Sequence, residues 1–183
     1  MSSFLASLRI CLVSLLVCAG GYTALVLLVA QVVTPHTANG SLVTAPDGRV
    51  LGSERLAQAF TKPDCFWPRP SAVGYNGAGA GGSNKSPTST DLTERATKTV
   101  AEHGASAARP MPPDLAAASG SGLDPHITER AARYQVDRVA TARQLPRKQV
   151  EALIAAHAFA PGGFLTSDRI VSVLELNIAL GRP

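Results

Sequence analysis

The sequence predicts a single N-terminal transmembrane helix followed by a mixed α/β (α+β) soluble domain. Residues 10–33 hold no charged side chain. A helix of this length, at about 1.5 Å per residue, crosses the roughly 30 Å hydrocarbon core of a bilayer. Residues 34–183 instead mix turn-rich, strand-like and amphipathic helical stretches. That mixture is typical of one compact domain built from helices and small sheets.

The first element, residues 10–33, is predicted to be a retained helix, because the apolar region of a cleaved signal peptide is only about 7–15 residues long. Arg9 lies on its N-terminal side, and no Lys or Arg follows before Arg49. Basic flanks favour the cytoplasm. This asymmetry predicts a cytoplasmic N-terminus (1–9), a transmembrane helix (10–33) and an extracytoplasmic, periplasmic domain (34–183).

Turns and short strands are expected next, over residues 34–53, where the turn sequence "PDGRV" precedes a strand-like stretch. Residues 60–90 are rich in Gly, Pro and Ser, and a loop of this length in a compact domain is usually functional or disordered. A weak helix is expected over 91–108. The long loop also contains three aromatic residues that would not be left in solvent, so it should be packed and irregular: Phe66, Trp67 and Tyr75.

The clearest helical pattern covers residues 128–145. Its apolar arc also carries three polar residues, Gln135, Arg138 and Arg143. Burying such groups without partners costs kilocalories. Two explanations are open. The long side chains extend past the core into solvent, or they pair with Asp124, Glu175 or a neighbouring subunit.

Two further elements complete the expected domain. Pro146 suits the first turn of a second helix, whose i, i+3, i+4, i+7 stripe ends on His157, expected to be a core or helix-end histidine. Residues 169–180 alternate as a strand, with Glu175 and Asn177 on the face opposite to the apolar side chains. A strand that turns into a short helix is the alternative. The apolar face of the strand would hold Ile170, Leu174, Leu176 and Ile178.

The sequence predicts no catalytic set, no metal site and no nucleic-acid binding. There is no G-x-S-x-G nucleophile motif, and the three cysteines lack zinc-ligand spacing. The formal charge is +4, but Glu129 and Asp137 interrupt the most basic stretch, 128–148, whereas phosphate tracking needs a continuous basic surface. The histidines also show no ligand spacing: His36, His103, His126 and His157.

Two glycine-rich stretches have the composition of phosphate loops. "GAGGSNKS" (79–86) follows the G-x-x-x-x-G-K-[ST] frame except that Asn84 replaces the last Gly, and it is this Gly that lets the backbone turn around the phosphates. The other stretch lies ahead of the 128–145 helix, where exposed backbone N–H groups could hold an anion. The plainer interpretation is a turn and helix cap, formed by Asp124 with Pro125, or by Thr128. The second stretch consists of Ser119, Gly120, Ser121 and Gly122.

Taken in order, several segments resemble the KdpC family of the bacterial potassium-transporting Kdp ATPase. After the N-terminal apolar helix come "ANGSL", "GSERLAQAF", "FWPRPSAVGYN", "AGGSN", "SGSGLDPHIT", "YQVDRVATAR" and "VLELNIAL", in the order and spacing of the family. The resemblance covers nearly the whole chain. One departure is Ser172, where the family usually has Asn.

This resemblance implies a non-catalytic accessory subunit of a high-affinity potassium uptake complex in the bacterial inner membrane. The implied partners are a channel-like potassium-selecting subunit, a P-type ATPase subunit that hydrolyses ATP, and a very small helical subunit. Potassium is the transported ion, and ATP is bound through the ATPase partner. Family descriptions also name a catalytic chaperone that raises ATP affinity, and compare a glycine-serine stretch like 119–122 with the signature loop of ABC transporters.

The predicted topology conflicts with direct ATP contact. If residues 34–183 lie outside the membrane, Ser119 to Gly122 do not reach cytoplasmic ATP, and any effect on ATP affinity crosses the membrane as a coupling free energy. Two alternatives remain beside the accessory subunit. One is a membrane-anchored periplasmic enzyme such as a hydrolase, and the other is a direct nucleotide-binding regulator.

Overall fold

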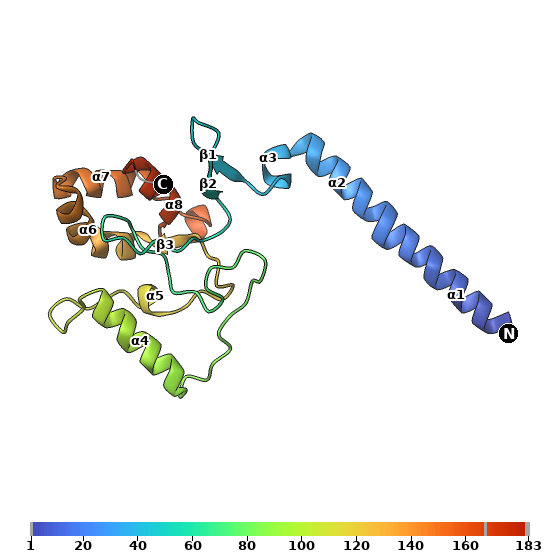
Figure 1. Cartoon of the computed structure of the whole chain (residues 1–183), viewed down its shortest axis with the longest axis horizontal. Helices are drawn as coiled ribbons and strands as arrows, with labels where there is room; N and C mark the ends of the chain where they lie inside the picture. The colour runs from blue at the N-terminus through green and yellow to red at the C-terminus, as the bar shows by residue number, and fades with distance from the viewer. Residues whose placement is uncertain (1, 167, 182–183) are drawn as a thin grey trace. The chain divides into compact units, whose positions relative to one another are not determined.

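The computed structural model describes residues 2–166 and 168–181. The chain divides into two compact units, Met1–Leu42 and Val43–Pro183. The first is helical, and the second mixes helices with two small sheets, as Figure 1 shows. The predicted fold class, an apolar N-terminal helix followed by an α+β domain, is confirmed.

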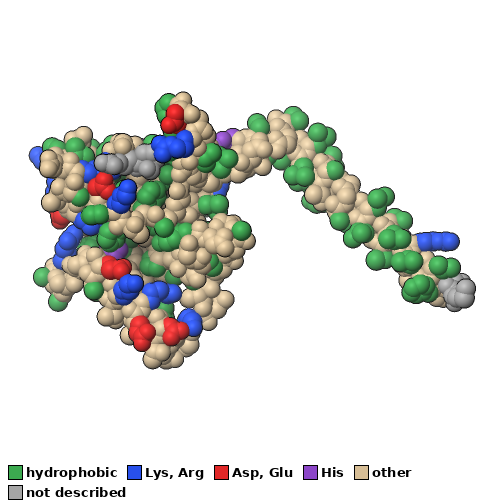
Figure 2. Space-filling model, in the orientation of Figure 1, with side chains coloured by type: hydrophobic (Ala, Val, Ile, Leu, Met, Phe, Trp, Pro, Cys, Tyr) green, Lys and Arg blue, Asp and Glu red, His purple; other side chains and the backbone are tan. Residues whose placement is uncertain are grey.

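The first unit is one nearly continuous helix, formed by α1 (Ser2–Leu15), a π-helical turn η1 (Leu16–Gly21) and α2 (Tyr22–Val33). The most apolar 18-residue stretch within residues 3–33 has a mean hydropathy of 2.3, and none of it is buried within the structure. Figure 2 shows apolar side chains along its length. A helix that is apolar on all faces is stable only in an apolar environment, and this one is long enough to cross a membrane. A single helical turn, α3 (Pro35–Ala38), follows.

A short hairpin begins the second unit, with strands β1 (Leu42–Thr44) and β2 (Val50–Ser53) paired with each other. Asp47 Oδ1 accepts a hydrogen bond from the Arg49 amide at 3.0 Å, and Gly48 has a φ of +81°. An Asx turn followed by glycine in the left-handed region is favourable chemistry for a tight turn. The expected turns and short strands are therefore confirmed.

Residues 54–89 run as turns and irregular backbone, as expected for the long Gly- and Pro-rich loop. Phe66 is fully buried, and Trp67 and Tyr75 are half-buried. The loop is followed by α4 (Thr90–Glu102) and the short α5 (Pro113–Ala116). The expected helix over 91–108 ends earlier because Gly104, at a φ of +61°, leaves the helical conformation.

Two antiparallel strands and three helices form the C-terminal half. β3 (His126–Thr128) leads into α6 (Glu129–Arg143), and α7 (Arg147–His157) packs against α6. The Thr128 Oγ1 atom accepts a hydrogen bond from the Ala131 amide at 3.0 Å and so caps α6. Gln144, in the left-handed region, ends it. A 3₁₀ turn, η2 (Gly163–Leu165), precedes β4 (Ile170–Ser172), and β4 pairs with β3.

The prediction of a strand over 169–180 is wrong beyond Ser172, and the alternative of a strand turning into a short helix is right. Residues Val173–Ala179 form α8. Its N-cap is Ser172, whose Oγ accepts from the Glu175 amide at 3.3 Å. Serine and asparagine are equally good caps, which explains why Ser172 can stand where the family usually has Asn. The predicted placement of Asn177 opposite to the apolar side chains is therefore also wrong. The buried residues have the i, i+1, i+3, i+4 spacing of one helix face, and they are Val173, Leu174, Leu176 and Asn177.

The core of the second unit lies between α6, α7, α8 and the β3–β4 pair, which Figure 1 shows grouped together. Phe66 reaches this core from the long loop, and Leu115 reaches it from α5. The core therefore joins the loop, the small α5 region and the C-terminal helices into one unit. Its other members are mainly aliphatic, including Ile127, Val136, Val139, Val150, Ile154, Val171 and Leu176.

Candidate functional site

Residues 63–67, here called the anchored segment, cross the C-terminal core without belonging to a sheet. Each of their five carbonyl groups nevertheless accepts a hydrogen bond from a side chain of another element. Buried backbone groups need partners, and here side chains supply what a neighbouring strand would supply. The donors are Gln135, Arg138, Arg143 and Asn177.

Two primary-amide side chains hold consecutive residues of the anchored segment. Asn177, fully buried on α8, accepts from the Phe66 amide at 2.7 Å and donates to the Phe66 carbonyl at 3.1 Å. Gln135, 1% exposed on α6, accepts from the Trp67 amide at 2.8 Å and donates to the Trp67 carbonyl at 3.1 Å. Each amide therefore satisfies one donor and one acceptor, as an adjacent strand does.

Two arginines complete the network. Arg138 donates to the carbonyls of Pro63 at 2.6 Å and Cys65 at 2.8 Å, and its guanidinium lies 3.8 Å from the centre of the Trp67 ring. Burial lowers the pKa of Arg138 to about 10, so it stays charged at neutral pH. Arg143 donates to the Asp64 carbonyl at 2.5 Å and also to the Leu180 carbonyl at the end of α8.

Of the two explanations for polar residues on the apolar arc of α6, pairing is right, but with other partners than Asp124 and Glu175. Asp124 instead contacts Arg69 at 3.2 Å and accepts from the His126 amide at 3.0 Å. Glu175 is exposed. The sequence could not reveal the true partners, because they are backbone carbonyls and any residue type provides those.

Trp67, the last residue of the anchored segment, lines a groove of about 580 Å³ together with other residues of the long loop, and α4 lies on the other side. Trp67 and Tyr75 contribute aromatic surface, and Arg95 and Lys98 of α4 contribute positive charge. The Trp67 ring packs edge-on against His103, with 5.1 Å between ring centres. Burial, with the nearby Arg138 charge, lowers the pKa of His103 to about 4, so this imidazole is neutral and weakly basic at pH 7.

The glycine-serine stretch Ser119–Gly122 packs against the other glycine-rich stretch. The Gly81 amide donates to the Ser121 carbonyl at 2.7 Å, and Ser71 Oγ donates to the Gly122 carbonyl at 2.6 Å. The Ser119 and Gly122 amides donate within the domain, to Pro70 and Ser119 carbonyls. Two of the four amides that a phosphate would use therefore already have protein acceptors.

Gly122 is required where it lies. Its φ is +70°, and a Cβ there would come within 2.6 Å of Val73 Cγ2 and 2.9 Å of the Gly81 carbonyl oxygen. Gly120, two residues earlier, has open space around its Cα. The stretch acts in this structure as a turn between two loops and the start of β3, and the α6 cap is Thr128 rather than Asp124.

No Ser, Thr or Cys side chain of residues 2–166 and 168–181 is hydrogen-bonded to the rings of His103, His126 or His157. Among the described residues, no group of three or more His, Cys, Asp or Glu side chains is placed to hold a metal ion. Cys65, the cysteine outside the apolar helix, is 6% exposed, and burial, with the Asp64 carboxylate, raises its thiol pKa. The thiolate, which is the reactive form, is thus disfavoured.

The fold and the site define a class of protein. It is a small α+β domain that follows one helix long enough to cross a membrane, and the inward-facing polar side chains of the domain bind its own backbone. Residues 4–182 match the family described as K+-transporting ATPase, c chain. The chain belongs to this family, KdpC, whose members are subunits of the potassium-transporting ATPase.

Three relatives illustrate the match, and each is named a potassium-transporting ATPase KdpC subunit. The protein of Parvibaculum lavamentivorans is 63% identical over 182 residues, covering 100% of this chain and 97% of the relative. That of Citrifermentans bemidjiense is 47% identical, covering 90% and 89%. That of Pseudomonas aeruginosa is 43% identical, covering 92% and 91%.

Proposed function

We propose that this chain is a non-catalytic accessory subunit that stabilises a potassium-transporting ATPase complex from outside the cytoplasmic membrane. The observation that carries this proposal is the hydrogen bonding of Gln135, Arg138 and Asn177 to the anchored segment. These polar side chains could have bound a ligand or taken part in chemistry, but they hold the anchored segment in place instead. A rigid loop with no exposed nucleophile–base pair among the described residues suits a docking domain better than an enzyme.

In this proposal the apolar helix packs among the membrane subunits, and the domain covers the side from which potassium enters. The partners are the channel-like subunit, the P-type ATPase subunit and the small helical subunit. The family proposal that this subunit raises ATP affinity then requires a coupling free energy transmitted through the membrane. The internal hydrogen bonds of Ser119 and Gly122 favour this indirect route over direct ATP contact.

Purification from membranes in mild detergent tests the assembly. The chain is expected to co-purify with the two large subunits, and its deletion is expected to reduce potassium-stimulated ATPase activity while the large subunits are still made. Recovery of the chain alone, with unchanged ATPase activity after its deletion, would contradict the proposal. Hydrolysis of generic ester or peptide substrates by the purified full chain would instead favour the membrane-anchored hydrolase.

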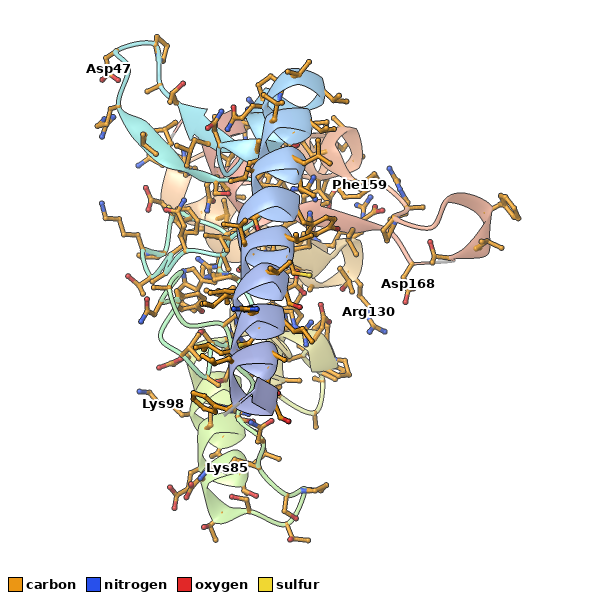
Figure 3. All side chains as sticks on the ribbon, turned by 90° about the vertical axis from the view of Figure 1, so that its right-hand side faces the viewer. Asp47, Lys85, Lys98, Arg130, Phe159 and Asp168 are labelled. Carbon is orange, nitrogen blue, oxygen red and sulfur yellow. The ribbon has the colours of Figure 1, made fainter. Side chains whose placement is uncertain are left out.

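Cysteine labelling on intact cells tests the topology. Cys65 is unsuitable as a reporter because it is buried, but the Lys98 side chain is 78% exposed and extends away from the ribbon in Figure 3. A Lys98→Cys variant is expected to react with a membrane-impermeant maleimide before lysis. Cys65 serves as the internal control and should react only after denaturation. Labelling of the new cysteine only after lysis would place the domain in the cytoplasm and favour the nucleotide-binding regulator.

A further inference from the structure

The most basic stretch of the sequence has a specific shape in the structure. A groove of about 560 Å³ runs between the 109–113 segment, α6 and the start of α7. Four arginines and a single carboxylate, Asp137, line it. These arginines come from three separate elements, so the fold gathers positive charge that the sequence disperses. They are Arg109, Arg130, Arg133 and Arg147.

The carboxylates near this groove are outnumbered. Asp137 is shared by Arg147 and Arg109, the latter at 3.7 Å. Arg147 also forms an ion pair with Glu151 at 2.8 Å. Arg130 is exposed and has no ion pair or side-chain hydrogen bond with any other residue in the described part of the chain. It projects away from the ribbon in Figure 3. A guanidinium has five N–H donors, so the groove keeps unused donor capacity directed at anions.

A carboxylate beside the groove is also shared by two arginines. Glu129 is shared by Arg133 at 2.6 Å and Arg169 at 3.2 Å. Three ion-paired carboxylates, Asp137, Glu129 and Glu151, therefore face a larger number of arginines, and the surface keeps a net positive charge. These arginines are Arg109, Arg130, Arg133, Arg147 and Arg169. Positive potential in a concave surface concentrates anions and accelerates the docking of acidic partners.

The remaining lining is that of a protein interface. The Arg109 guanidinium lies 4.4 Å from the centre of the Tyr134 ring and donates to the Tyr134 carbonyl at 2.6 Å, so this arginine is held in place. Met111 and three prolines add an apolar, stiff wall. Arg, Tyr and Met are enriched at protein–protein interfaces, and a preorganised wall lowers the entropy lost on binding.

We infer that this arginine groove docks an acidic, extended segment of another subunit, with Asp or Glu carboxylates bridging Arg130 and Arg147. The inference rests on the proposed accessory role and names its contact surface. Carboxylates match the planar, two-pronged geometry of guanidinium groups. The concave shape and the apolar wall favour a peptide chain over the flat headgroup layer of a membrane.

Binding of a fluorescent oligo-glutamate peptide to the purified full chain in neutral detergent tests this chemistry. We expect the dissociation constant to rise, meaning weaker binding, when the salt concentration increases from about 50 mM to about 200 mM. The Arg130→Glu/Arg147→Glu variant is expected to bind about tenfold more weakly. The matched control, Arg55→Glu/Lys62→Glu, makes the same change in charge at two exposed positions outside the groove and should bind as the unmodified chain does.

Equal binding by both double variants would overturn the inference. So would binding to vesicles of phosphatidylglycerol without binding to oligo-glutamate, since that assigns the surface to lipid. If the charge reversal lowers the melting temperature, Arg130→Gln alone keeps the test valid, because Arg130 has no side-chain partner to lose within the described residues.

The same variants in the assembled complex separate this inference from the proposed function. A photo-crosslinker in place of Arg133 is expected to capture an acid-rich segment of a partner subunit, and one in place of Lys62 is not. If the chain does not assemble with the complex at all, the proposed function fails whatever the peptide measurement gives. If it assembles and the crosslinker captures no partner, only the groove assignment fails.

Discussion

Replacing Asn177 with alanine is expected to lower the free energy of unfolding by about 3–5 kcal/mol. The change leaves the amide and the carbonyl of Phe66 buried without partners and opens a cavity beneath α8. Urea denaturation of the full chain in detergent, followed by tryptophan fluorescence, measures the loss. Trp67 adjoins the affected residue and is the sole tryptophan, so the signal reports on the anchored segment.

Glu175→Ala is the matched control for this change, because Glu175 lies on the same helix with an exposed side chain. It should alter stability by no more than about 0.5 kcal/mol. Similar losses for the two variants would mean that Asn177 does not hold the anchored segment. Asn177→Asp is a second informative variant: it keeps the acceptor for the Phe66 amide but faces the Phe66 carbonyl with a second acceptor.

Replacing Gly122 with alanine is expected to cost about 2–4 kcal/mol. An alanine at a φ of +70° is strained, and its Cβ would lie 2.9 Å from the Gly81 carbonyl oxygen, a backbone atom that cannot rotate away. Thermal unfolding of the full chain in detergent measures the loss. The neighbouring Gly120→Ala variant has open space and should stay close to the unmodified chain.

This glycine pair also separates the two interpretations of the glycine-serine stretch. If it is a structural turn, only Gly122→Ala lowers stability, and Gly120→Ala leaves the ATP affinity of the assembled complex unchanged. In a phosphate loop the backbone approaches the phosphates closely, and an added Cβ at an open glycine can block that approach. A loss of ATP affinity in Gly120→Ala, with stability intact, would therefore contradict the turn interpretation.

Most of the fold could be predicted from the sequence because it depends on local patterns. The apolar run of residues 10–33, the "PDGRV" turn and the amphipathic 128–145 stretch each indicate their own structure. The 173–179 segment could not be assigned firmly, since a short apolar stretch fits both a strand and a helix. Only the pairing of His126–Thr128 with Ile170–Ser172 limits the strand to three residues.

The candidate site was only half predictable. Gln135, Arg138 and Arg143 stood out because they are polar residues on the apolar face of a helix, and that signal was correct. Asn177 was instead placed on the polar face of a strand, and only the helix that forms there buries it. Their partners were not visible, because backbone carbonyls carry no mark in the sequence and lie up to 111 residues away. The arginine groove was missed for a related reason. Its basic residues are separated in sequence by carboxylates that the fold distributes between several arginines.

The contacts of the anchored segment also determine when the domain can fold during translation. Phe66 leaves the ribosome long before Asn177, and at about 5–20 residues per second the 111 residues between them take on the order of ten seconds to synthesise. Through that interval Phe66 has neither its hydrogen-bond partner nor the helix that covers it. Translation must therefore be almost finished before the domain can complete its core. During most of its synthesis the nascent chain exposes an aromatic, hydrophobic segment that chaperones, proteases and neighbouring chains can bind.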